Sequence, residues 1–124
     1  MIAVTLLTSL TDQGLGEIGV KGDGVEQVVR LAALARSAGL DGVVASPQKI
    51  AALRTRLGRD FLIVTPGVRG ANDAKGDQQR TLTPAEALAA GADYLVVGRP
   101  IIEARDPRRA AELVAAECRA ALPA

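Results

Sequence analysis

Four short aliphatic runs, each followed by a segment with helical periodicity, constrain the fold of this chain more than any other feature. The runs lie at 2–7, 42–45, 61–65 and 94–97. They are apolar without alternating, as strands are when helices cover one sheet face and other side chains fill the opposite one. The pattern therefore predicts an α/β fold with parallel strands, organised as one domain over residues 1–124.

The segments between these runs carry helix signals at both ends. Apolar residues at helical spacing predict a helix over 25–38, ended by Gly39. Ser46 and Pro47 predict the start of a second helix, which Gly58 ends. Thr83 and Glu86 form the pattern of a capping box for a short third helix, and a fourth begins at 107 and runs to about 122.

Composition removes several classes of chemistry. With no histidine and one cysteine, the chain can build neither a Ser-His-Asp triad nor a Cys/His zinc site, and histidine acid-base catalysis is excluded as well. Aromatic residues make up 2% of the chain, and the formal net charge is +1, which argues against nucleic acid as a partner. No apolar run approaches the roughly 20 residues that span a bilayer, and a lone cysteine fits a reducing compartment, so we expect a cytoplasmic protein.

Polar residues follow the predicted strands at their carboxyl ends, where parallel α/β folds bind ligands. Thr8 and Ser9 follow the first run, Pro66 and Arg69 the third, and Gly98 and Arg99 the fourth. Glycine allows close approach of the backbone, and the planar arginine fork suits phosphate oxygens. A phosphate site is the prediction, although an isolated Gly-Arg-Pro also occurs in turns with a solvated arginine.

Residues 68–82 form a predicted loop of about fifteen residues, whereas ordinary connections take about 2–6. Such length is typical of a lid, and the Gln78 amide could contact both a phosphate and a base. An ordinary surface loop is the alternative. The Thr8 and Ser9 hydroxyls likewise allow two interpretations: contact with the edge of a heterocycle, or capping of the next helix.

Five blocks in this order resemble one known family, the bacterial type of orotidine 5′-phosphate decarboxylase. They are 4–9 (VTLLTS), 39–46 (GLDGVVAS), 64–69 (VTPGVR), 76–80 (GDQQR) and 91–101 (GADYLVVGRPI). The resemblance implies a (βα)8 TIM barrel, a fold of about 250 residues, of which this chain is the second half with strands five to eight.

The resemblance also implies a function: a cofactor-free lyase that converts orotidine 5′-phosphate to UMP and carbon dioxide in pyrimidine biosynthesis. It implies pyrimidine contacts at Thr8 and Ser9, a lid amide at Gln78 and a phosphate grip at Arg69, Gly98 and Arg99. Pro66 belongs to the same expected substrate site.

One part of the family's pattern is absent. The catalytic Asp-x-Lys-x-x-Asp motif does not occur, since Asp73, Lys75 and Asp77 have the wrong spacing and position. No catalytic residue is assigned, and the isolated chain is expected to be inactive. We expect a homodimer or a complementing amino-terminal half. The alternatives are a catalytically silent phosphate-binding half-barrel or assembly module, and another sugar-phosphate barrel, against which the Gly-Asp-Gln block argues.

Overall fold

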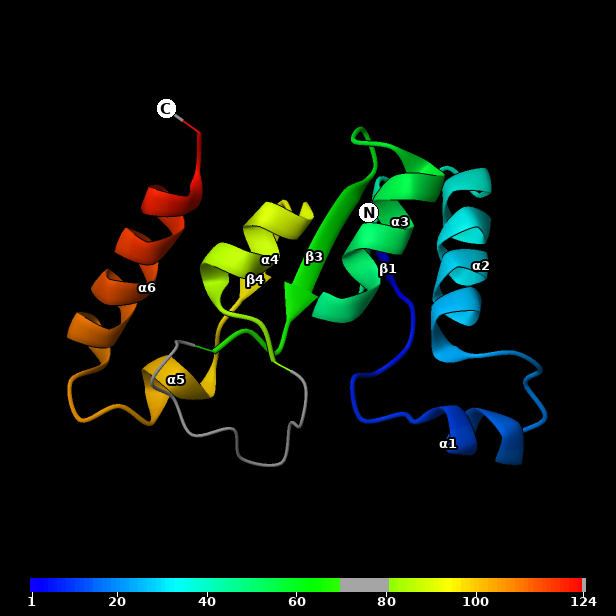
Figure 1. Cartoon of the computed structure of the whole chain (residues 1–124), viewed down its shortest axis with the longest axis horizontal. Helices are drawn as coiled ribbons and strands as arrows, with labels where there is room; N and C mark the ends of the chain where they lie inside the picture. Colours follow the sequence, from blue (N-terminus) through cyan, green and yellow to red (C-terminus); the bar gives the residue numbers. More distant parts are fainter. Residues whose placement is uncertain (70–80, 124) are drawn as a thin grey trace.

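The computed structural model describes residues 1–69 and 81–123, and within these ranges strands alternate with helices (Figure 1). The elements in chain order are β1 (Ile2–Val4), α1 (Asp12–Glu17), α2 (Gly24–Ser37), β2 (Gly42–Val44), the 3-10 turn η1 (Pro47–Lys49), α3 (Ile50–Leu57), β3 (Leu62–Pro66), α4 (Pro84–Ala90), β4 (Tyr94–Val96), α5 (Arg99–Ile102) and α6 (Pro107–Ala121). The predicted α/β class is confirmed.

The described strands form one parallel sheet in the order β1-β2-β3-β4. Val4 lies opposite Val44, Val44 opposite Val64, and Val64 opposite Tyr94. Consecutive strands are therefore neighbours, as expected for parallel strands joined by helical crossovers. The carboxyl ends of all four strands consequently meet at one end of the sheet.

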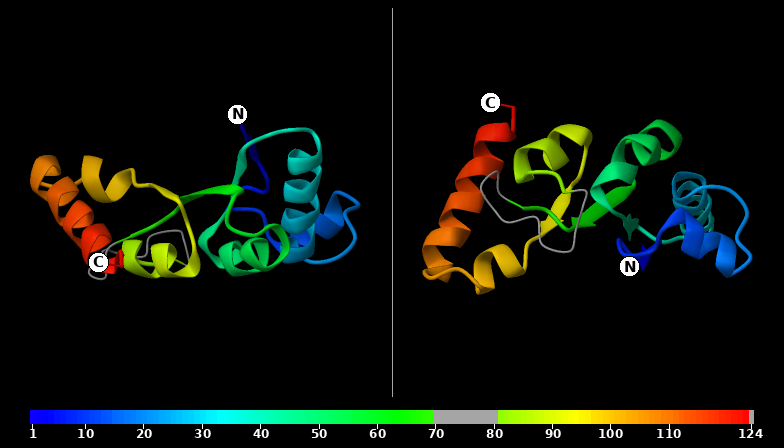
Figure 2. Two further views of the ribbon diagram at one scale, coloured as in Figure 1. Left: turned by 90° about the horizontal axis from the view of Figure 1, so that it is seen from above. Right: turned by 60° about the horizontal axis from the view of Figure 1, so that its bottom comes forward.

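The core lies between the sheet and its helices. From the sheet it takes Val43 and Ile63, and from the helices it takes Val28, Ala32 and Leu53, all at most 1% exposed. The view from above shows α3 and α4 on one side of β3 (Figure 2). This helix-facing side of the sheet is thus the buried side, and it holds the strand ends in place.

Most helix ends lie where the capping residues and glycines in the sequence predicted them. Gly39 follows α2 with a φ of 84°, a conformation that glycine adopts without strain. At α4 the capping box is present: the Glu86 amide donates to Thr83 Oγ1 at 3.2 Å, and the Thr83 amide donates to Glu86 Oε2 at 2.8 Å. Ser46 is the N-cap of η1 and Pro47 its first residue, as predicted, but the Ser46 side chain makes no capping hydrogen bond.

The expected strand ends and two short helices need correction. β1 ends at Val4 rather than at residue 7, because the chain then leaves the sheet toward α1. The sequence prediction missed α1, which Thr11 caps by accepting from the Gly14 amide, and α5, which starts at Arg99. Both helices are too short for periodicity to reveal.

Arg54 joins the amino ends of β3 and β4. Its guanidinium donates to the carbonyl oxygen of Phe61 at 2.7 Å and to that of Gly91 at 2.6 Å, and it pairs with Asp93 at 2.5 Å. The Asp93 carboxylate in turn accepts from the Ile63 amide at 2.7 Å. These bonds hold the two strands that carry the candidate site in a defined relation to each other.

Candidate functional site

Two arginines from adjacent strand ends meet in one pocket. The pocket has a volume of about 220 Å³, and its lining residues are Arg69, Arg99, Pro100, Glu103 and Ala104. Arg69 follows β3 and Arg99 follows β4, at the end of the sheet that points down in Figure 1. Residues 30 positions apart in the sequence are thereby brought to one rim, as the sequence analysis predicted for these two side chains.

A glycine turn directs Arg69 to this rim. Gly67 has a φ of 75°, a conformation that side chains with a Cβ rarely adopt. The chain then buries Val68, which is 2% exposed, and the Arg69 amide donates to the carbonyl of Leu82 at 3.1 Å. That bond joins the two ends of the segment that carries the predicted loop. The sequence analysis gave Gly67 no separate role, although its position after a Pro indicates a turn.

Arg99 is held at the start of a helix rather than in an open turn. Gly98 is the N-cap of α5, and its carbonyl accepts from the amides of Ile101 at 2.9 Å and Ile102 at 3.1 Å. A Cβ built on Gly98 would meet nothing within 4 Å, so space lies open beside this backbone among the described residues. The predicted Gly-Arg-Pro turn is therefore the first turn of a helix, because the fixed φ of Pro100 suits that position.

The pocket suits an anion with more than one negative charge. Two guanidinium groups offer paired N–H donors in a planar fork that matches the spacing of phosphate oxygens. Glu103 supplies one carboxylate to the same lining, so the two arginines leave the pocket with one net positive charge. Charge-assisted bonds of this kind are stronger than neutral ones, which makes phosphate a suitable ligand.

The other predicted site residues lie apart from this pocket or outside the described ranges. Thr8 and Ser9 are exposed in a turn after β1, which the Leu10 amide closes by donating to Leu7. Thr11, not Thr8 or Ser9, caps the helix that follows. Pro66 is the last residue of β3 and lies opposite Val96. Gln78 lies outside the described residues.

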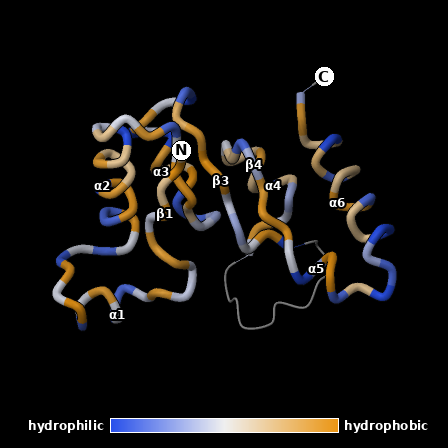
Figure 3. The backbone as a smooth tube through the Cα atoms, turned by 180° about the vertical axis from the view of Figure 1, so that it is seen from behind, coloured by the Kyte–Doolittle hydropathy of each residue, from blue (hydrophilic) through white to orange (hydrophobic). Residues whose placement is uncertain are grey.

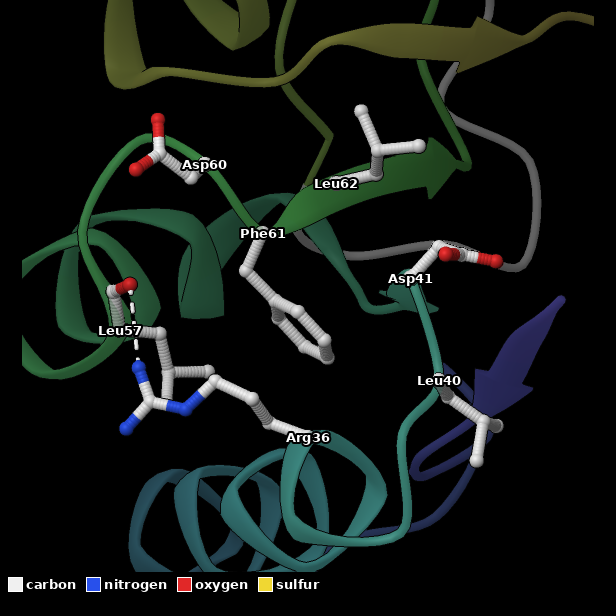
Figure 4. Close-up of a pocket in the computed structure, with 7 residues that line it drawn as sticks. All are labelled: Arg36, Leu40, Asp41, Leu57, Asp60, Phe61 and Leu62. Atoms are coloured by element: carbon white, nitrogen blue, oxygen red, sulfur yellow. Dashed lines mark hydrogen bonds between the residues drawn. The ribbon is translucent and has the colours of Figure 1, made fainter.

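A larger pocket of about 600 Å³ lies at the opposite end of the sheet, where the amino ends of β2 and β3 are (Figure 4). Asp41 and Asp60 line it together with Phe61 and Leu62. Its arginine, Arg36, donates to the carbonyl of Leu57 at 3.3 Å. Two carboxylates against one arginine make this pocket unsuitable for a phosphate, so the arginine pocket remains the candidate site.

Within residues 1–69 and 81–123, no helix is long and apolar enough to cross a membrane.

Comparison with known proteins identifies close relatives. The chain is 58% identical over 114 residues to the orotidine 5′-phosphate decarboxylase of Geobacter sulfurreducens, covering 92% of this chain and 48% of the relative. It is 58% identical over 118 residues to the enzyme of the same name from Moorella thermoacetica, covering 94% and 47%. The chain thus spans about half the length of the curated relatives it matches.

Solved structures agree with these relatives. A crystal structure of orotidine 5′-phosphate decarboxylase from Lactobacillus acidophilus superposes with a TM-score of 0.80 at 41% identity, covering 94% of this chain and 48% of the other. An uncharacterised conserved protein from Geobacillus kaustophilus gives 0.75 at 38% identity, covering 94% and 47%. The fold is therefore about half of the barrel that these neighbours form.

The family model described as "Orotidine 5'-phosphate decarboxylase / HUMPS family" matches residues 1–114. Since this match covers nearly the whole chain, and since the curated relatives are up to 58% identical to it, the chain belongs to the orotidine 5′-phosphate decarboxylase family of lyases.

Proposed function

We propose that this chain is the phosphate- and pyrimidine-binding half of an orotidine 5′-phosphate decarboxylase. In this proposal residues 1–124 form one half-barrel unit that corresponds to strands five to eight. The observation that carries it is the convergence of Arg69 and Arg99 in one pocket at the carboxyl ends of β3 and β4. Ligands of parallel barrels bind at that end.

The substrate phosphate would bind between the two arginines, next to the Gly98 backbone. Thr8, Ser9 and Pro66 follow or end strands of the same sheet, so they face the same end of the unit. We assign the Thr8 and Ser9 hydroxyls to the pyrimidine, because a hydroxyl can both donate to and accept from its edge. The loop at 68–82 would close over the bound nucleotide, with Gln78 between phosphate and base.

The phosphate is remote from the bond that breaks, yet its binding contributes to the reaction. Binding energy from a non-reacting group can stabilise the closed, reactive form of an enzyme and so lower the barrier. The arginines would therefore affect turnover as well as affinity. The chain's own residues hold and orient the substrate in this proposal, and no proton transfer is assigned to them.

The lysine and carboxylates that carry out decarboxylation would come from a complementing amino-terminal half. This chain lacks the Asp-x-Lys-x-x-Asp motif, and it covers 48% of the Geobacter sulfurreducens relative. The missing strands would complete the barrel, in the cytoplasm, with orotidine 5′-phosphate as substrate and UMP and carbon dioxide as products.

Complementation tests this proposal. The chain is mixed or fused with the amino-terminal half of the Geobacter sulfurreducens relative, and carbon dioxide release from orotidine 5′-phosphate is measured. Each half alone serves as a control. We expect activity only when both halves are present. A folded complex of the two halves that binds UMP but releases no carbon dioxide would favour the silent phosphate-binding module instead.

A further inference from the structure

The 8–9 turn, which carries the Thr8 and Ser9 hydroxyls, lies in a part of the chain that strand pairing does not hold. Just after β1, the amide and the hydroxyl of Thr5 both donate to the carbonyl of Val44, at 3.1 and 2.8 Å. From there to the start of α2 the chain forms turns and the short helix α1 (Figure 1). Contacts outside the sheet must therefore fix the geometry of this turn.

Apolar packing holds α1 at one point. Leu15 is 1% exposed, and the other five residues of this helix are Asp, Gln, Glu and two glycines. Hydrophilic and hydrophobic residues alternate over short distances along α1 and the turns beside it (Figure 3). Apolar contacts have no preferred direction, so one buried leucine leaves α1 free to rotate about it. A hydrogen bond, which is directional, can fix that rotation.

Asp12 supplies such a bond. It is the first residue of α1, and its Oδ1 accepts from the amide of Gly24 at 2.8 Å in a partly buried position. Gly24 is the first residue of α2, where backbone amides have no partner inside the helix and negative charge is favoured. The bond therefore joins α1 to the amino end of α2 across twelve positions in the sequence.

The lack of a side chain at Gly24 allows this approach. A Cβ built there would lie 3.0 Å from Asp12 Oδ1 and 3.3 Å from Nζ of Lys49, the last residue of η1. Carbon atoms in favourable contact are about 3.5–4.0 Å apart, so any larger residue would push the carboxylate away. The carboxylate and the ammonium group consequently lie against the same helix end.

α2 is a firm point of attachment for α1. Its residues Val28, Ala32 and Ala35 are at most 7% exposed and belong to the core that also contains Val43 of β2. The helix contacts both β1 and β2. Moving α2 would open this core, so the amino end of α2 has a defined position relative to the sheet.

The position of α1 in turn determines that of the 8–9 turn. Asp12 lies three residues after Ser9, and Thr11, between them, is the N-cap of α1. The Leu10 amide closes the turn by donating to the carbonyl of Leu7 at 3.1 Å. Few backbone torsions thus separate the anchored carboxylate from the two hydroxyls.

We propose that Asp12, through its bond to the Gly24 amide, is a positioning residue for the hydroxyls of Thr8 and Ser9. This inference rests on the proposed function, which assigns those hydroxyls to the pyrimidine. Asp12 itself does not contact the substrate. The arginine pocket lies beyond β3 and β4, whereas β1 is the far edge strand, so Asp12 affects recognition of the base and not of the phosphate.

Hydrogen exchange tests the positioning without a ligand. In Asp12→Ala the Leu10 amide should exchange several-fold faster than in the wild type, because the turn loses its attachment to α2. Amides in the middle of α2 should exchange as before. Asp12→Asn keeps a side-chain oxygen that can accept from the Gly24 amide, so it should restore most of the protection.

Asp23→Ala is the matched control. Asp23 is the N-cap of α2, and its Oδ1 accepts from the Glu26 amide at the same distance of 2.8 Å. This substitution removes a carboxylate from the same helix end, but the lost bond does not reach α1. It should lower stability in urea denaturation and leave the exchange of the Leu10 amide unchanged.

Binding of UMP and of ribose 5-phosphate, measured by calorimetry, tests the consequence for recognition. The wild-type chain should prefer UMP. Asp12→Ala should reduce this preference several-fold while the dissociation constant of ribose 5-phosphate stays the same. Gly24→Ala should act in the same direction, because its Cβ displaces the Asp12 carboxylate, and Asp23→Ala should keep the preference.

Different results would overturn different conclusions. Leu10 exchange that is unchanged in Asp12→Ala, or equally raised in Asp23→Ala, would overturn the role of Asp12, as would equal losses of affinity for both ligands. If Asp12→Ala fails to fold by circular dichroism, Gly24→Ala takes its place in both measurements. A wild-type chain that binds both ligands equally would overturn the assignment of Thr8 and Ser9 in the proposed function, while hydrogen exchange would still decide whether Asp12 holds the turn.

Discussion

Arg99 is the residue on which the candidate site depends most. It lies at the start of α5 and lines the same pocket as Arg69. A guanidinium can hold two phosphate oxygens at once, whereas the ammonium of a lysine acts as a point charge. Its contribution should therefore be specific to a phosphorylated ligand.

In the complex with a complementing half, Arg99→Ala should lower kcat/KM for orotidine 5′-phosphate by roughly 100-fold. Arg99→Lys should have a kcat/KM between those of the wild type and Arg99→Ala. Decarboxylation of the phosphate-free nucleoside should change little. Arg105→Ala, at an exposed arginine beyond α5 that is not part of the pocket lining, is the matched control. Equal losses with both substrates would mean that Arg99 has a structural role.

Thr65 lies outside the candidate site and bears on the stability of the chain, because it is a buried polar residue. The residue is fully buried on β3, and its Oγ1 has no hydrogen-bond partner among the described residues. Burying a hydroxyl without a bond costs stability.

Thr65→Val should therefore raise the free energy of unfolding by about 1 kcal/mol in urea denaturation. Thr5→Val is the matched control: Thr5 Oγ1 donates to the carbonyl of Val44 at 2.8 Å, so its loss should lower stability by about 1 kcal/mol. If both substitutions destabilise the protein, the Thr65 hydroxyl has a partner that this structure does not include.

At the scale of elements, single residues at the helix ends contribute to stability through capping hydrogen bonds. The capping box of α4 was predicted from Thr83 and Glu86 and is present in the structure. The backbone amide of Thr83, followed by its hydroxyl, holds the pKa of Glu86 below its ordinary value. The cap is thus coupled to pH.

Because the pKa of Glu86 is lower in the folded chain than in the unfolded one, its contribution is present above the unfolded pKa. It is lost as the pH falls through the folded value. The stability difference between wild type and Glu86→Gln should therefore shrink from about pH 6 to about pH 3, measured by urea denaturation at each pH. A difference that stays constant over this range would show that the carboxylate charge does not contribute.

At the scale of the whole molecule, the proposed function divides the features of a decarboxylase between this chain and the strands that it lacks. In that proposal the chain supplies the pocket lined by Arg69 and Arg99 and the strand ends beside it, while the lysine and carboxylates come from the missing strands. Interactions that bind substrate and transition state equally give affinity without chemistry.

The isolated chain should therefore release no carbon dioxide from orotidine 5′-phosphate above the uncatalysed rate. It should still bind UMP more tightly than uridine, as measured by calorimetry, since the arginine pocket lies within one chain. Turnover by a purified chain free of contaminating enzyme would require a catalytic group that the present proposal does not contain.

The amino-acid sequence by itself determined the parallel α/β class, the helices at 25–38, 84–90 and 107–122, and the family. Those features depend on local information: apolar spacing, caps such as Thr83, and breakers such as Gly39. The convergence of the two arginines was also predictable, because strand ends share one edge of a parallel sheet.

Only the tertiary structure decided how the remaining features lie. It placed Thr8 and Ser9 in a turn after β1, the strand at the far edge of the sheet from β4, and it made Gly98 the N-cap of α5. These features arise from contacts between residues distant in the sequence: the pairing of strands, and the packing of helices against one side of them. Local sequence patterns do not specify which distant residues pack together, so these features could not be predicted from them.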